Sequence, residues 1–180
     1  GHDAMSDIVP GALIPEAPVL SVEDALKTFT IHEDFVVESV VAEPLVDKPV
    51  ALTFDGRGRM WVVEMRGYMP DIDGKGEDEP VGRIAILEDT TGDGKADKRT
   101  LFLDKILLPR TIALVPNGII YGDQSQLFFV ERDGDKPKGK PVVVDDNYSR
   151  GSNVEHKPNG MMLGIDNWMY NSKSSHRYQW

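Results

Sequence analysis

The chain has 180 residues, of which 40% are hydrophobic and 28% are charged, a composition typical of a globular domain with a real core and not of a disordered chain. Its 30 acidic and 20 basic residues give a formal net charge of -10, and the basic residues form no stripe, which argues against binding to nucleic acid. The absence of cysteine excludes disulfides, thiolate metal sites and covalent c-type haem attachment in this chain. No apolar run approaches the roughly 18 to 20 residues that cross a bilayer.

The N-terminal part reads as a segment outside the main fold. Residues 1–5 look like an expression-tag remnant, and a start just after such a remnant is what removal of a signal peptide leaves, so we expect a secreted or periplasmic protein. Residues 6–34 are expected to run extended through several prolines and then form a short helix. Ser21 with Asp24 three residues later has the spacing of a capping box, and the apolar face of this helix reaches Phe29.

From residue 35 onward the sequence has β character. The run 35–41 is rich in β-branched residues, and shorter apolar runs follow, separated by turns with glycine, asparagine and aspartate. The predicted strands cover residues 50–54, 59–65, 83–88, 99–103, 112–115, 119–122, 126–131, 140–144, 160–164 and 168–171.

The predicted strands repeat as units. An apolar strand, a tight turn and an aromatic residue in the next strand recur at roughly 50 to 60 residues, within the range of propeller blades. We therefore predict an all-β fold, a partial β-propeller of about three blades of four antiparallel strands over residues 35–180, with a short N-terminal helix; a β-sandwich is the alternative. The predicted blades are residues 35–104, 105–150 and 151–180.

An incomplete ring of blades leaves strand edges unpaired and apolar faces exposed. We expect the chain to be followed by further blades or haem domains of a longer protein, or to self-associate through its open blade edges.

The loop 89–97 has the ligand pattern of a compact calcium site. Oxygen ligands stand at positions one, three, five and nine, with glycine at position six and a carbonyl at position seven. A threonine at position three and another at position twelve depart from the usual pattern, and a polar hairpin is the alternative. The predicted ligands are Asp89, Thr91, Asp93, the Lys95 carbonyl and Asp97.

A second candidate site lies in the run 153–160, immediately ahead of the first predicted strand of the third unit. Loops that enter the inner strands of a propeller supply side chains to its axial pocket, so His156 is placed to face that pocket. Histidine accepts a hydroxyl proton near neutral pH, and the adjacent Glu155 can hold it or raise its basicity. A structural or solvated histidine is the alternative.

Other polar residues stand at equivalent strand ends. Glu64, Arg66 and Tyr68 follow the second predicted strand and can reach the same mouth, although a structural ion pair explains them equally well. Arg110 stands at the entry to the second unit. The predicted contacts to a cofactor are Arg110, Arg66 and Asn153.

Two stretches carry a family resemblance. Residues 44–68, including Asp-Gly-Arg-Gly-Arg-Met-Trp-Val-Val-Glu-Met-Arg-Gly-Tyr, together with 86–89 and 93–97, resemble the propeller of planctomycete and verrucomicrobial membrane-bound dehydrogenases. The segment from His156 to Tyr170 is similar to that around the catalytic base of soluble quinoprotein glucose and sorbosone dehydrogenases. The resemblance implies that His156 is the base and Glu155 its acidic neighbour, with hydride passing to pyrroloquinoline quinone bound with Ca²⁺.

Three functions remain open on the sequence. The first is an oxidoreductase that acts on a small sugar or polyol through a quinone. The second is a non-catalytic propeller that binds a glycan or a protein and serves as a scaffold. The third is a lyase or hydrolase that uses His156 with Tyr68 or Arg66.

Overall fold

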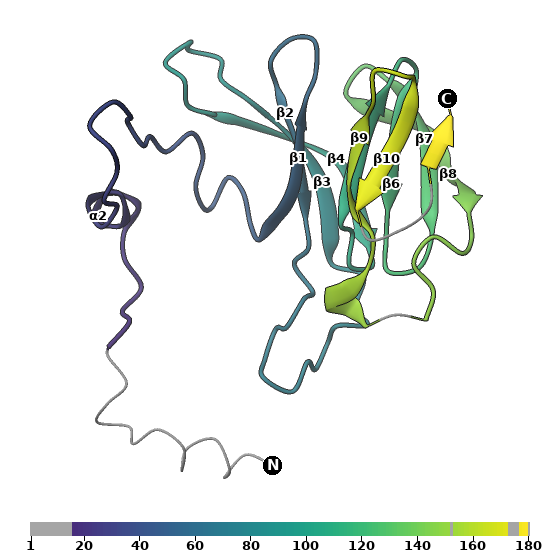
Figure 1. Cartoon of the computed structure of the whole chain (residues 1–180), viewed down its shortest axis with the longest axis horizontal. Coiled ribbons are helices and arrows are strands. Elements are labelled where there is room, and N and C mark those ends of the chain that lie inside the picture. Colours follow the sequence, from purple (N-terminus) through teal and green to yellow (C-terminus); the bar gives the residue numbers. More distant parts are fainter. Residues whose placement is uncertain (1–15, 152, 173–176, 180) are drawn as a thin grey trace. The chain divides into compact units, whose positions relative to one another are not determined.

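Short antiparallel strands are the main regular structure of the protein. A computed structural model describes residues 16–151, 153–172 and 177–179, which divide between Ser39 and Val40 into two units that are considered separately. In the second unit the strands form two four-stranded sheets and one three-stranded sheet. Within each sheet, strands that follow one another in the chain pair with each other (Figure 1). The sheets consist of β1 (Pro49–Phe54), β2 (Met60–Glu64), β3 (Gly82–Glu88) and β4 (Lys98–Ile106); of β5 (Thr111–Val115), β6 (Gly118–Gly122), β7 (Leu127–Asp133) and β8 (Lys136–Asp145); and of β9 (Asn159–Leu163), β10 (Trp168–Ser172) and β11 (Arg177–Gln179).

The predicted all-β fold with four-stranded antiparallel sheets is thus confirmed, and the predicted strands lie within a few residues of the observed ones. The run 35–41 is an exception, because the structure gives it no strand. A β-branched run becomes a strand only beside a partner backbone. The carbonyl of Val40 accepts a hydrogen bond from the N–H of Ala96, but no ladder continues from there among the described residues.

The first unit contains α2 (Val22–Lys27), a six-residue helix. Its N-cap is Ser21, as predicted: the hydroxyl oxygen accepts the backbone N–H of Asp24 at 3.1 Å. The carboxylate of Asp24 accepts the Ser21 hydroxyl at 2.8 Å, in place of the backbone N–H that a capping box would use. The helix ends before Phe29, which is exposed, so its apolar face is shorter than predicted. No helix in the described part of the chain is long and apolar enough to span a membrane.

The turn between β1 and β2 shows why the hairpins form where they do. Gly58 has a φ of 78°, which a residue with a Cβ rarely adopts. The carboxylate of Asp55 accepts the backbone N–H groups of Arg57 and Arg59 at 2.9 and 3.1 Å, closing the turn. These local bonds set the register in which Phe54 faces Met60.

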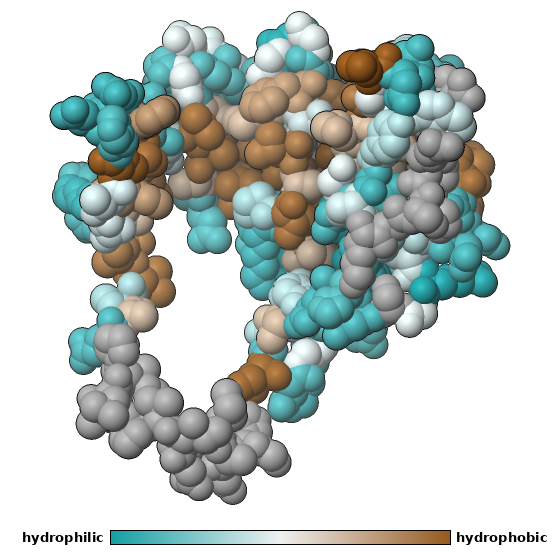
Figure 2. Space-filling view, in the orientation of Figure 1, coloured by the Kyte–Doolittle hydropathy of each residue, from teal (hydrophilic) through white to brown (hydrophobic). Residues whose placement is uncertain are grey.

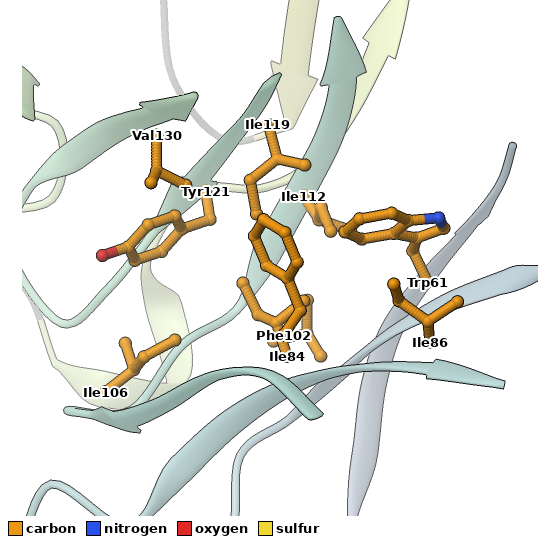
Figure 3. Packing of buried hydrophobic residues seen from close by; sticks show 10 residues of the cluster. Trp61, Ile84, Ile86, Phe102, Ile106, Ile112, Ile119, Tyr121 and Val130 are labelled. Carbon is orange, nitrogen blue, oxygen red and sulfur yellow. The ribbon is translucent and has the colours of Figure 1, made fainter. Parts of the chain in front are cut away.

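Apolar side chains from facing sheets fill the space between them. Between the first and second sheets, Trp61 and Phe102 meet edge to face at 4.8 Å and pack with isoleucines of both sheets (Figure 3). A second cluster, including Ala113 and Met169, joins the second and third sheets. The first strands of the sheets also lie side by side, with β1 next to β5 and β5 next to β9.

A buried ion network joins the first two sheets at the end where β1 turns into β2. The guanidinium of Arg59, 5% exposed, donates to Asp55 at 2.9 Å and to both carboxylate oxygens of Asp135 at 2.7 and 2.8 Å. Asp135 belongs to the turn between β7 and β8. The indole N–H of Trp61 donates to Asp55 at 3.2 Å, so core and network share one residue.

The face that carries β1 and β9 leaves apolar side chains exposed (Figure 2). They include Leu52 and Phe54 on β1, and Met162 and Leu163 on β9. A cavity of about 260 Å³ lies where these strands meet β5. Self-association or further blades on such surfaces stay a prediction.

Candidate functional site

The loop before β9 contains a single helical turn, η2 (Val154–His156). Asn153 caps it, because its side-chain oxygen accepts the N–H of Glu155 at 3.3 Å and its carbonyl accepts the N–H of His156 at 3.0 Å. The sequence predicted Asn153 as a contact to a cofactor. In the structure its side-chain oxygen already has a partner, the N–H of Glu155. His156 itself is exposed at the end of the turn.

The loop after β2 meets this turn. Both lie at the same end of the sheets (Figure 1), and the hydroxyl of Tyr68 donates to the carboxylate of Glu155 at 3.1 Å, although 87 positions separate the two residues. Loss of hydration and the hydrogen bond to Glu155 raise the pKa of Tyr68 above its usual range. The structure thus brings Glu155, the acidic neighbour of the predicted base, to a tyrosine that the sequence indicated could reach the same mouth.

Arg110, immediately before β5, lies against the same turn. It is 5% exposed, and its Nη1 donates to the carbonyl oxygen of Val154 at 2.9 Å. Its Nε and Nη2 are shielded from water and have no hydrogen-bond partner among the described residues. Burial lowers the pKa of Arg110 because it disfavours the charged form.

Lys157, the residue after η2, is also buried, and sequence reasoning missed it. Its ammonium donates to the carbonyl oxygen of Gln124, in the segment after β6. Burial and, to a smaller extent, repulsion from Arg110 lower the pKa of Lys157. No signal in the sequence distinguishes it from an ordinary surface lysine, apart from its place between His156 and a proline.

Arg66 lies in a different environment. It donates from Nε to Asp47 at 2.6 Å, and this bond raises the pKa of its guanidinium. Nearby, Glu64 is 1% exposed and pairs with Arg99 at 2.8 Å, so the structural ion pair considered for this strand end is present. These residues line a cavity of about 420 Å³ together with Glu43, Pro44, Val46 and Arg83.

The predicted calcium loop joins β3 and β4, where its carboxylates bind its own backbone. Asp89 accepts N–H groups of Gly92 at 2.7 Å and Gly94 at 2.8 Å, and these bonds lower its pKa despite some loss of hydration. Asp93 accepts the N–H of Lys95, and the Asp97 carboxylate accepts the N–H and hydroxyl of Thr90. Thr91 donates both its N–H and its hydroxyl to Asp89.

This arrangement gathers no calcium ligand set. Across residues 16–151, 153–172 and 177–179, no three histidine, cysteine, aspartate or glutamate side chains come together as they would around a metal ion. Calcium binding by the loop 89–97 stays a prediction.

Comparison with known proteins places the chain in a family. The model of a domain of unknown function, DUF7133, matches residues 21–179. The chain belongs to this family. None of the curated proteins matches it.

The fold of this DUF7133 chain is similar to that of solved carbohydrate-active enzymes of family AA12 from Trichoderma reesei. A calcium structure matches with a TM-score of 0.52 and 14% identity over 76% of this chain and 31% of that one. An iodide structure matches with a TM-score of 0.50 and 12% identity over 76% of this chain and 32% of that one. The chain thus spans about a third of the length of these structures, and at such identity the likeness concerns the fold.

Proposed function

We propose that the three sheets are successive blades of a β-propeller, and that the protein is a quinoprotein-type dehydrogenase of sugars or polyols related to the planctomycete and verrucomicrobial membrane-bound dehydrogenases. The side-by-side first strands and the apolar clusters between facing sheets support a radial arrangement. The AA12 enzymes of similar fold are carbohydrate-active, which supports a sugar as the substrate class. Secretion or a periplasmic location belongs to the same proposal.

The observation that carries the proposal is the η2 turn, which presents Glu155 and His156 beside two further polar residues at one end of the sheets. In the proposed reaction the His156 imidazole accepts the hydroxyl proton of the sugar, as imidazole side chains commonly do in general base catalysis. Glu155 lends negative charge next to the resulting imidazolium. Tyr68 holds that carboxylate by its hydrogen bond, and Arg110 anchors the turn through Val154.

The residues present fit a quinone in part. Pyrroloquinoline quinone, when bound, would accept the hydride, and its carboxylates need cationic partners. Nε and Nη2 of Arg110 are buried and have no hydrogen-bond partner in the part of the chain that the structure describes, whereas Arg66 is paired with Asp47 and the side-chain oxygen of Asn153 caps η2. Arg110 is therefore the residue of this chain that we expect to hold an anionic group. No step is assigned to Ca²⁺, because the loop 89–97 directs its carboxylates to its own backbone.

The test is dye reduction by the protein supplied with pyrroloquinoline quinone, Ca²⁺ and a panel of aldoses and polyols. His156→Ala should lower turnover by about 100-fold or more, the usual contribution of a general base. The matched control is His32→Ala, which removes another exposed histidine, from the first unit.

Turnover equal in the His156→Ala and His32→Ala proteins would refute the assignment of the base. Binding of a sugar without turnover, unaffected by either change, would instead favour the non-catalytic scaffold.

A further inference from the structure

Two cationic side chains are buried at the η2 turn. Arg110 and Lys157 are 5% and 6% exposed. The hydrogen bonds that the structure gives their side chains go to carbonyl oxygens, of Val154 and Gln124, and not to carboxylates. In a chain whose net charge is -10, two buried cations without a bonded carboxylate stand out.

The neighbouring carboxylates bond to other groups. Asp123 acts on both cations through its charge, but its Oδ1 accepts the N–H groups of Ser125 and Gln126 at 2.8 Å each. Oε1 of Glu155 accepts the hydroxyl of a tyrosine. Among the described residues, Asp123 therefore acts on the two cations through space and not through a hydrogen bond.

Burial of such charges opposes folding. Desolvation is the largest influence on the pKa of Arg110 and of Lys157, and it lowers both. A buried cation that lacks a hydrogen bond to a counterion is costly. A bound anion would offset part of this cost.

The free donors of Arg110 have the geometry that a carboxylate needs. Nη1 is used by Val154, while Nε and Nη2, which lie on one edge of the guanidinium, have no partner among the described residues. Two parallel N–H groups on one edge bind the two oxygens of a carboxylate at once. Lys157 directly follows η2, the turn to which Arg110 bonds through Val154, and adds a second positive charge there.

We propose that Arg110 and Lys157 form a binding site for a carboxylate. Nε and Nη2 of the arginine, which have no hydrogen-bond partner among the described residues, are shielded from water, so binding of a ligand there requires the residues that cover them to move. The site adjoins the turn that carries His156, so the acid group is bound next to the group proposed as the base.

The identity of the ligand rests on the proposed function, whereas the carboxylate site does not. A sugar acid as substrate and pyrroloquinoline quinone, itself a polycarboxylate, present the same chemistry. The two sources are separated by using sodium glucuronate, its neutral counterpart glucose, and pyrroloquinoline quinone as three probes.

Isothermal titration calorimetry and thermal unfolding of the whole chain, measured without turnover, test the site. We expect glucuronate or the quinone, but not glucose, to raise the unfolding midpoint in a way that depends on the arginine. Arg110→Gln should weaken binding of that probe at least tenfold. Lys157→Gln should weaken it several-fold while leaving the contact to Val154 intact, and it keeps the test open if the first variant does not fold. The matched control is Arg57→Gln, which removes a 65% exposed arginine side chain.

Binding of glucuronate over glucose identifies a sugar acid as the ligand, and binding of the quinone alone identifies the cofactor. The proposal is overturned if neither carboxylate binds the unaltered chain, or if the folded Arg110 and Lys157 variants bind as tightly as the control. The binding measurement involves no turnover. Failure of the dehydrogenase assay therefore leaves the carboxylate site standing, and failure of carboxylate binding leaves the assignment of the base standing.

Discussion

Replacing Asp135 by asparagine should break the ion network between the first two sheets without removing volume. Arg59 donates two hydrogen bonds to this carboxylate, at 2.7 and 2.8 Å. Asparagine keeps one oxygen as an acceptor, but its amide group is a donor and faces a donor of the guanidinium. The charge and one of the two bonds are lost, while Asp55 remains as the second partner of Arg59.

The magnitude follows from the burial of the two partners. The Arg59 side chain is 5% exposed and that of Asp135 is 33% exposed. Breaking a fully buried pair costs about 3 to 5 kcal/mol, and a hydrogen bond to a charged group is worth about 1.5 to 3 kcal/mol. Because Asp135 is partly hydrated and Asp55 still neutralises the guanidinium, we expect Asp135→Asn to lower the free energy of unfolding by about 2 kcal/mol.

Urea denaturation followed by tryptophan fluorescence measures this change, since Trp61 lies between the network and the core. Arg57→Gln is the control: its side chain also contacts Asp135, at 3.3 Å, but it is 65% exposed and should contribute less than about 0.5 kcal/mol. Equal effects of the two changes would refute the role given to burial. A double-mutant cycle of Asp135→Asn with Arg59→Met that shows no coupling would also refute this role.

Two further predictions concern the first two sheets. Gly118→Ala places a Cβ against the carbonyl oxygen of Val130, closer than real Cβ atoms come, and should cost about 3 kcal/mol in urea denaturation. Gly56→Ala, where nothing lies within 4 Å of the added Cβ, should cost less than about 0.5 kcal/mol; equal losses would show that crowding is not the cause. Burial alone would raise the pKa of Asp55, but hydrogen bonds from Trp61 and from backbone N–H groups outweigh it and lower the pKa to about 2. Because this folded value lies below the ordinary 3.8, the contribution of about 2 kcal/mol is present above pH 4 and lost as the pH falls through 2. Denaturation measured at pH values between 2 and 6 should show this loss of stability. The part that is due to Asp55 should be absent from the Asp55→Asn protein.

The strands and their turns were predictable because their causes are local. The turn that begins at Asp55 is closed by bonds within five residues, and Gly58 supplies the positive φ. The run 35–41 has the same β-branched composition as a strand, but a strand also needs a partner backbone, which no local pattern supplies.

The sequence could predict only those residues of the candidate site whose type by itself suggests a chemical role. His156 and Arg110 stand at the entries of β9 and β5, and their types alone suggested a base and an anion contact. Arg66 was an equally good candidate by type, but in the fold it pairs with Asp47. Burial of Lys157 depends on residues far away in the sequence, so no local pattern identified it.

One end of the sheets carries an ion network that stabilises the fold, and the other end carries the proposed binding site. Arg59 precedes β2 at one end, where two carboxylates satisfy its guanidinium; Arg110 precedes β5 at the other end, where two of its N–H groups have no partner among the described residues. The same residue type, buried to the same 5%, is thus neutralised within the fold at one end and left for an outside group at the other. A fold can keep an unsatisfied cation only if other contacts hold the surrounding elements in place. The Arg59 network and the apolar cluster around Trp61 meet that requirement for the first two sheets, which leaves the opposite end free to bind an anion.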